Sequence, residues 1–133
     1  MTVDRRTVEA DDGLRIQVTL RGDGPLLLFF PGGIGLPTGY APLIRLLSQR
    51  FTLGMYDRRG HGHSATPDSD QLTIEQHGRD AATVIDQLNR GPALVLGSSA
   101  GAVIGLELLA HIIHPELVPE DSIRPAQALT VEL

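Results

Sequence analysis

The sequence predicts an α/β sandwich of three layers, with helices on both faces of a mostly parallel sheet. Short apolar runs, which suit strands buried on both faces, alternate along the chain with segments of helical periodicity. Fifteen Gly and nine Pro residues divide the chain between these segments. A chain of 133 residues can bury an ordinary core, so residues 1–133 are expected to form a single domain.

The N-terminal part predicts a hairpin, a buried strand, a helix and a second buried strand. Thr2–Ala10 and Leu14–Arg21 flank an Asp-Asp-Gly turn, and an Asp-Gly pair is typical of hairpins. Leu26–Phe30 is a continuous apolar run between Gly-Pro and Pro-Gly-Gly, as expected for a strand of a parallel sheet. Ala41–Gln49 has apolar residues at helical spacing, and Phe51–Tyr56 predicts the second buried strand.

The rest of the chain begins with a polar, Gly-rich loop at Asp57–Asp70. Thr73–Leu88 follows helical rules, with its first residue as the N-cap and a Gln three positions later. Ala93–Leu96 predicts a third short buried strand, and Ser99–His114 is apolar nearly all round, which predicts a buried central helix. In the Pro-rich C-terminal stretch, Ala128–Leu133 is the one segment that suits a further strand.

Composition excludes several classes of function. Sixteen acidic residues against eleven basic ones give a net charge of −5, which argues against a nucleic-acid partner. There is no Cys, so disulfides, thiolate metal sites and Cys nucleophiles are excluded. The N-terminus is charged where a secretory signal needs an apolar core, and Leu94–Ala110 is too short and polar to span a membrane. We therefore expect a cytoplasmic protein that does not bind membranes.

The motif that carries chemistry is Gly97-Ser98-Ser99-Ala100-Gly101, a G-x-S-x-G sequence between an expected strand and an expected helix. In this context Ser99 would occupy a sharp turn from which its hydroxyl projects, and glycine at positions 97 and 101 removes side chains that would collide there. The N-terminus of the following helix adds partial positive charge where an oxyanion would form. The alternative interpretation is a Gly/Ser turn that only lets the helix pack closely on the sheet.

With its neighbours, this motif resembles the N-terminal half of an α/β-hydrolase, of the serine esterase/haloperoxidase-like branch. The matching segments, in chain order, are Leu27–Gly33, Tyr56–Ser64, Gly97–Gly101 and His114–Val118. The similarity covers residues 10–118, and residues 119–133 form a divergent tail. The resemblance therefore implies a single partial domain with a truncated α/β-hydrolase fold.

The resemblance implies that Ser99 is the nucleophile and that the backbone N–H of Ala100 is one oxyanion donor. It implies the N–H of Gly33 as the second donor, a small ester or related acyl compound as the substrate, and no cofactor and no metal. Read by itself, Gly32–Gly35 could instead cradle a phosphate, but no Gly-Lys-Ser/Thr follows it.

The remaining members of a catalytic triad are not evident. The family's chain order is Ser, then Asp or Glu, then His, so the acid and the base should come from a C-terminal half. His111 and His114 follow Ser99, but the intervening helix would carry them about 18–22 Å away, so neither is expected to be the base. Glu132 ends the last expected strand, where some relatives carry the acid, although a surface carboxylate is the simpler interpretation.

The other histidines are expected to be structural. His61 and His63 lie in the Gly-rich loop, where turn hydrogen bonds are the ordinary role and a substitute base is the alternative. His77 is expected to be solvated on an exposed helix face, and a metal site made by these three residues is a weaker hypothesis. Asp57 and Asp80 are expected to make structural hydrogen bonds or pairs with Arg.

Three functions remain open. The first is a hydrolase represented by an incomplete chain, whose tail a frameshift or a premature stop would explain. The second is a non-catalytic ligand-binding or interaction module on the same scaffold. The third is one half of a split hydrolase completed by another chain. If the sheet ended at Ala93–Leu96, its open edge would favour pairing with a second copy or with such a complementary chain, and one face of the following helix would stay uncovered.

Overall fold

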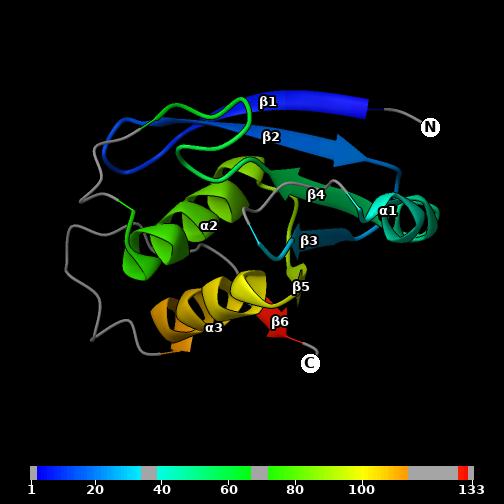
Figure 1. Cartoon of the computed structure of the whole chain (residues 1–133). Helices are drawn as coiled ribbons and strands as arrows, with labels where there is room; N and C mark the ends of the chain where they lie inside the picture. Colours follow the sequence, from blue (N-terminus) through cyan, green and yellow to red (C-terminus); the bar gives the residue numbers. More distant parts are fainter. Residues whose placement is uncertain (1–2, 34–38, 67–71, 114–128, 132–133) are drawn as a thin grey trace.

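The computed structural model describes residues 3–33, 39–66, 72–113 and 129–131, which form one sheet with helices on both faces (Figure 1). The strands are β1 (Val3–Glu9), β2 (Arg15–Arg21), β3 (Leu26–Phe30), β4 (Thr52–Tyr56), β5 (Ala93–Gly97) and β6 (Leu129–Val131). The helices are α1 (Ala41–Leu47), α2 (Ile74–Leu88) and α3 (Ala100–Ile113). Each element lies within two residues of the bounds expected from the sequence.

The sheet has the strand order β1-β2-β4-β3-β5-β6. The β1–β2 hairpin is antiparallel, and β2 joins β4 in antiparallel fashion, whereas β4, β3, β5 and β6 run parallel to one another. The mostly parallel sheet is thus confirmed. The sheet does not end at β5, because β6 pairs with it from Ala93↔Leu129 to Val95↔Val131. The open edge considered for that strand is therefore occupied over these residues.

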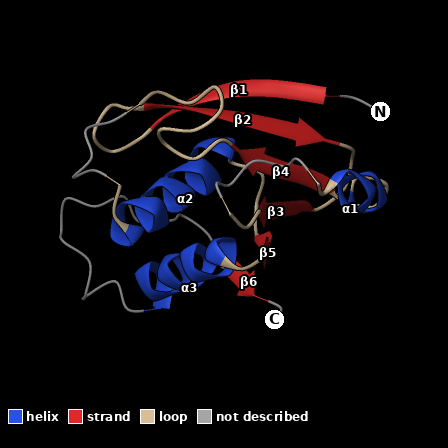
Figure 2. Ribbon diagram, in the orientation of Figure 1, coloured by secondary structure: helices blue, strands red, loops and turns tan. Residues whose placement is uncertain are grey.

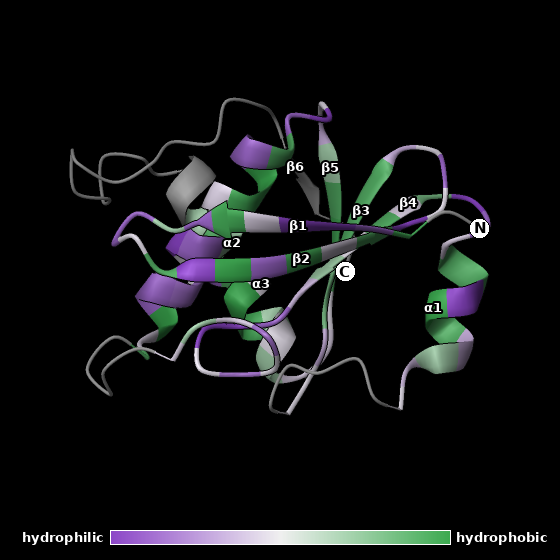
Figure 3. Cartoon of the chain, turned by 90° about the horizontal axis from the view of Figure 1, so that it is seen from above, coloured by the Kyte–Doolittle hydropathy of each residue, from purple (hydrophilic) through white to green (hydrophobic). Residues whose placement is uncertain are grey.

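The layers follow from the burial of β3 on both faces. Leu26, Leu28 and Phe30 belong to a core shared with α2 and α3, whereas Leu27 and Phe29 belong to a second core under α1. Seen from above, α2 and α3 lie on one side of the sheet and α1 on the other (Figure 3). An apolar side chain at every position of β3 is what a strand covered on both sides requires.

Helix α2 begins as the sequence predicts. The Thr73 side chain caps it by accepting a hydrogen bond from the Gln76 N–H at 3.2 Å. Helix α2 ends at Asn89, which adopts the left-handed conformation that terminates many helices.

Helix α3 differs from the expectation of a fully buried helix. Ile104 and Leu108 are buried, but Val103 and Leu106 are 51% and 55% exposed. The reason is that, in the part of the chain that the structure describes, the sheet and α2 cover only one side of α3. Within the same residues, no helix is both long and apolar enough to cross a bilayer.

Candidate active site

The turn between β5 and α3 places Ser99 in an unusual backbone conformation. Helix α3 starts immediately beyond the end of β5, with only Ser98 and Ser99 between them (Figure 2). Ser99 has a φ of 54° and is exposed to solvent. For a residue with a side chain this left-handed conformation costs about 1–2 kcal/mol, so the surrounding structure must impose it.

The two glycines of the motif are required by close backbone contacts. A Cβ at Gly101 would lie 1.9 Å from the Phe30 carbonyl oxygen, and a Cβ at Gly97 would lie 2.6 Å from the Ala102 Cα. Neither contact can be relieved by moving a side chain, because all the opposing atoms belong to the backbone. The glycine spacing in G-x-S-x-G therefore allows β3, β5 and α3 to meet at Ser99.

The loop that follows β3 lies directly against this turn. The Ser98 N–H donates to the Phe30 carbonyl at 3.0 Å. A Cβ at Gly32 would lie 3.0 Å from the Ser98 carbonyl oxygen and 3.1 Å from the Ser99 Cβ. Gly32 thus brings the backbone that leads into Gly33 next to the backbone that leads into Ala100.

Two backbone donors in these segments have no hydrogen-bond partner in the part of the chain that the structure describes. Gly33 is exposed with a φ of 60°, and Ala100 is in the first turn of α3, where N–H groups lack an acceptor within the helix. Among the described residues, neither N–H makes a hydrogen bond. An exposed hydroxyl beside two such donors is an arrangement that suits attack on a carbonyl group.

Arg58 binds two carbonyl groups of the loop after β3. Its Nη2 donates to the carbonyl oxygens of Pro31 at 2.9 Å and Gly33 at 3.2 Å. The Arg58 side chain is buried, and this burial lowers its pKa. This role could not be predicted from the sequence, since the first Arg of an Arg-Arg pair gives no sign of which carbonyl groups it will reach.

Tyr40 also binds the loop after β3, and the sequence analysis did not predict this contact either. Its hydroxyl accepts a hydrogen bond from the Gly32 N–H at 3.2 Å and donates one to Ser98 Oγ at 3.3 Å. The contact with Ser98, and then the one with Gly32, lower the pKa of Tyr40. The only signal in the sequence was a tyrosine immediately before a helix, which does not indicate a hydrogen-bonding partner 58 residues away.

A buried ion cluster anchors the loop after β4, in which Arg58 lies. The Arg59 guanidinium is fully buried and forms hydrogen bonds with both carboxylate oxygens of Asp80, at 2.7 and 2.8 Å, which confirms the expected Arg pairing of Asp80. Asp12, from the β1–β2 turn, binds the same guanidinium at 2.8 and 3.1 Å. Burial alone would lower the pKa of Arg59, but these hydrogen bonds raise it, and Arg59 in turn lowers the pKa of Asp12.

His61 and His63 have the structural partners that the sequence predicts. His61 Nδ1 lies 3.0 Å from the Arg59 carbonyl oxygen. His63 Nδ1 lies 3.3 Å from Asp57 Oδ2, and the same oxygen accepts the His63 backbone N–H at 2.8 Å. Neither ring makes a hydrogen bond to Ser99 among the described residues.

His77 is not solvated as expected. Its ring is partly buried, and Nδ1 is inaccessible to water without a hydrogen-bond partner in the described part of the chain. Burial, together with the nearby charges of Arg58 and Arg59, lowers the pKa of His77 to about 4. The expectation was wrong because this side of α2 faces the arginine-bearing loop rather than water.

The structure also bears on the hypothetical metal site and on the position of His111. Within the described ranges, no three His, Asp or Glu side chains converge in a way that could hold a metal ion, which removes the hypothesis of a three-histidine site. His111 lies in the last turn of α3, about 18 Å along the helix from Ser99 at 1.5 Å per residue. His114, Glu132 and Gly35 lie outside the described residues.

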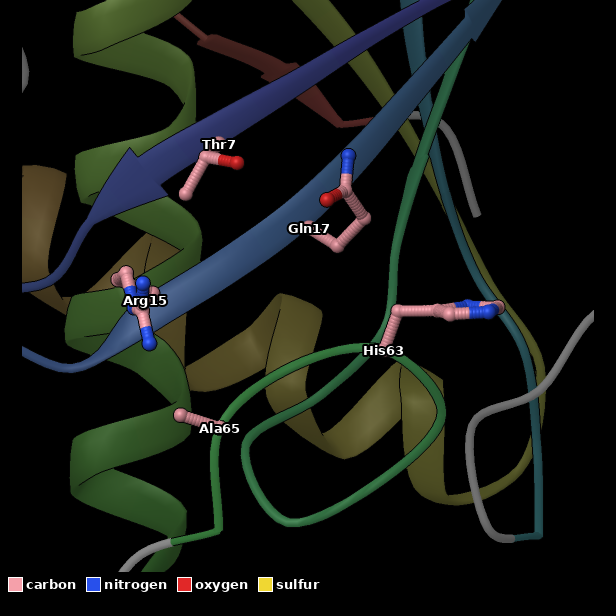
Figure 4. Close-up of a pocket in the computed structure, with 5 residues that line it drawn as sticks. All are labelled: Thr7, Arg15, Gln17, His63 and Ala65. Atoms are coloured by element: carbon pink, nitrogen blue, oxygen red, sulfur yellow. The ribbon is translucent and has the colours of Figure 1, made fainter.

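A polar surface pocket of about 290 Å³ lies elsewhere, between the β1–β2 hairpin and the loop after β4 (Figure 4). Its lining residues are Thr7, Arg15, Gln17, His63 and Ala65. None of them belongs to the Ser99 turn or to the loop after β3. The pocket is therefore separate from the candidate active site.

Comparisons with known proteins agree with this architecture. A family model described as the alpha/beta hydrolase fold matches residues 25–120. YraK, a hydrolase of Bacillus subtilis, is 37% identical over 119 residues, which are 89% of this chain and 43% of YraK. The 2-(acetamidomethylene)succinate hydrolase of Mesorhizobium japonicum is 36% identical over 105 residues, which are 79% of this chain and 37% of that protein.

Solved structures of hydrolases also match this chain. The crystal structure of E-2-(acetamidomethylene)succinate hydrolase matches with a TM-score of 0.73 at 34% identity, covering 88% of this chain and 42% of the other. The epoxide hydrolase VrEH1 of Vigna radiata matches with a TM-score of 0.73 at 27% identity, covering 97% of this chain and 38% of the other. The chain thus spans less than half the length of each of these proteins.

Proposed function

Because the chain belongs to the alpha/beta hydrolase fold family, we propose that it carries the nucleophile and oxyanion-binding part of a serine hydrolase site. The observation that carries the proposal is Ser99, an exposed serine with a φ of 54° between β5 and α3. A nucleophilic serine on a strained strand–turn–helix junction is the arrangement called the nucleophile elbow. In this proposal residues 1–133 form one partial domain of the fold.

The proposed reaction is acyl transfer to Ser99. The Ser99 Oγ attacks the carbonyl carbon of the substrate, the new O–C bond forms, and the carbonyl π electrons move to oxygen. The hydroxyl proton passes to a general base, which returns it to the leaving group as the C–O or C–N bond breaks. Water then attacks the acyl-serine in the same way, which releases the acid and restores the hydroxyl.

The oxyanion would be held by the N–H groups of Ala100 and Gly33. Both donors are free of protein acceptors among the described residues, and the positive end of the α3 dipole lies at Ala100. One such donor is worth about 10²–10³ in kcat in a serine protease. The loop and the turn that carry these groups are tied together at Gly32 and Ser98, which supports a fixed separation.

The acid and the base would come from a part of the family fold outside the described residues. Since this chain spans 43% and 37% of the two relatives described above, those groups have room in the remaining length of such a protein or in a complementary chain. Such a complementary chain, or a second copy of this one, would meet the sheet at β6, which is one of the two edge strands in the described residues. Until a base is supplied, the serine is expected to react slowly.

The proposed substrate is a small ester or a related acyl compound. One relative is named for the hydrolysis of 2-(acetamidomethylene)succinate, whose acetamido group contains an acyl carbon of the required kind. That name supports an acyl substrate here without identifying which one.

The test is acyl transfer from para-nitrophenyl acetate. Deacylation needs the same base as acylation, so we expect acetyl-Ser99 to accumulate slowly, with one nitrophenolate released per chain, and peptide mass spectrometry locates the acetyl group. Ser99→Ala should abolish the modification, and the matched control Ser48→Ala, whose hydroxyl binds the Ile44 carbonyl in α1, should leave it unchanged. A folded sample that is never acetylated at Ser99 would contradict the proposal and favour a non-catalytic binding module.

A further inference from the structure

The hydroxyl of Tyr40 connects the two segments on which the proposed site is built. It accepts the Gly32 N–H at 3.2 Å and donates to Ser98 Oγ at 3.3 Å. Gly32 immediately precedes Gly33, and Ser98 immediately precedes Ser99. In the part of the chain described by the structure, no other side chain makes hydrogen bonds to both segments.

We propose that Tyr40 is a positioning residue whose hydroxyl sets the separation between the loop carrying Gly33 and the turn carrying Ser99. This inference rests on the proposed function for the roles of those two residues. The separation matters because an oxyanion donor is effective only when it lies about 2.7–3.1 Å from the developing charge. Tyr40 does not itself touch the reacting atoms in this proposal.

The two hydrogen bonds require a group at Tyr40 that can both accept and donate a hydrogen bond. A backbone N–H can only donate, so the oxygen of Tyr40 must be the acceptor toward Gly32. The single proton of Tyr40 is then available for Ser98 Oγ, which accepts it. A phenylalanine at this position would leave both partners unsatisfied, whereas the ring contacts would be kept.

The aromatic ring holds the hydroxyl on a rigid support. Tyr40 packs edge-to-face on Phe29, with ring centroids 5.0 Å apart, and Phe29 is buried in β3. Gly32 also allows the close approach, because a Cβ there would lie 3.3 Å from the Tyr40 oxygen. Arg58 holds only the carbonyl groups of Pro31 and Gly33, so it cannot replace the connection to the turn.

The test compares Tyr40→Phe with Tyr56→Phe in the full chain. Tyr56 is the matched control, because it also packs on a β3 aromatic ring, Phe30, but its buried hydroxyl has no hydrogen-bond partner among the described residues. Two readouts are needed. One is the amide hydrogen exchange of Gly32, measured by NMR, and the other is the rate at which a fluorophosphonate probe labels Ser99 as a function of probe concentration.

We expect Tyr40→Phe to speed the exchange of the Gly32 amide by about three- to tenfold, the worth of one ordinary hydrogen bond. The maximal labelling rate should fall by a similar factor, while the probe concentration that gives half of that rate stays the same. If Tyr40→Phe only destabilised the fold, the maximal labelling rate would not fall without a change in the half-saturating probe concentration. Tyr56→Phe should leave the exchange and both kinetic parameters unchanged.

The outcomes distinguish a failure of the positioning role of Tyr40 from a failure of the proposed function of Ser99. Unchanged exchange at Gly32 in Tyr40→Phe would overturn the positioning role, whatever the labelling shows. Faster exchange with an unchanged labelling rate would also overturn it, because the separation would then not control Ser99. If the unmodified chain is not labelled at Ser99 at all, the proposed function fails, and the Gly32 exchange still decides whether the hydroxyl holds the two segments together.

Discussion

The close approach of α3 to the end of β3 leads to a sharp prediction for Gly101→Ala. The new Cβ would lie 1.9 Å from the Phe30 carbonyl oxygen, 2.5 Å from the Phe30 carbonyl carbon and 2.7 Å from the Pro31 carbonyl oxygen. To restore even a tight contact of 3.0 Å with the first of these atoms, the start of α3 must withdraw by about 1.1 Å. The substitution therefore acts on the backbone that positions Ser99.

The expected change in the free energy of unfolding follows from the atoms that the new Cβ would meet. Overpacking a core costs typically about 1–3 kcal/mol, and the upper end applies here because the opposing atoms are all backbone. Replacing Gly by Ala in a helix returns at most about 1 kcal/mol. We therefore expect Gly101→Ala to lower the free energy of unfolding by about 2–3 kcal/mol. At about 3.5 °C per kcal/mol for a chain of this length, the melting temperature should fall by about 7–10 °C.

Gly105→Ala is the matched control on the same helix. A Cβ there would lie 3.6 Å from Val95 Cγ1 and no closer to any other atom outside its own helix, which is an ordinary van der Waals contact. This change should raise the free energy of unfolding by about 0.5–1 kcal/mol through helix propensity. Urea unfolding followed by circular dichroism measures both variants. If Gly101→Ala were as stable as Gly105→Ala, the proposed reason for the glycine spacing would be refuted.

Three further outcomes are expected. Replacing Arg59 by Met leaves the buried Asp80 carboxylate without its ion-pair partner and should cost about 3–5 kcal/mol in urea unfolding, whereas Arg6→Met, which breaks an exposed pair, should cost less than about 1 kcal/mol. Equal losses would refute the buried cluster. The pKa of His77 is about 4 in the fold and about 6.5 in an unfolded chain, so the unfolded state binds more protons and stability should fall from pH 6.5 to pH 4. His77→Gln should remove that part of the loss, and an unchanged pH profile would contradict it. If the base is absent, added imidazole should accelerate the labelling of Ser99 in proportion to its neutral form; a rate independent of imidazole would mean that the chain supplies its own base.

Much of the fold could be predicted because its signals are local. The apolar run Leu26–Phe30 predicts a strand covered on both faces, and the sequence Thr73 to Gln76 predicts a capped helix start, and both were confirmed. The turn at Ser99 could be predicted because strand, glycines and helix all lie within a few neighbouring residues. In each case the signal lies in residues that are close together in the sequence.

The parts that could not be predicted depend on residues far apart in the chain. Tyr40 reaches Ser98 across 58 residues, and His77 is buried near the charges of Arg58 and Arg59, which lie in a different segment of the chain. The exposure of Val103 and Leu106 on α3 depends on which neighbours the helix has, which an apolar sequence does not reveal. Such features can be predicted only when the relative positions of three or more elements are known.

Site-resolved labelling tests the proposal that Ser99 is the reactive serine of this fold. The purified chain is treated with a fluorophosphonate probe, digested and mapped by mass spectrometry, with Ser99→Ala as the control. We expect slow labelling that is confined to Ser99 and is absent from Ser99→Ala. Labelling that persists in Ser99→Ala, or a folded sample that carries no label on Ser99, would contradict it.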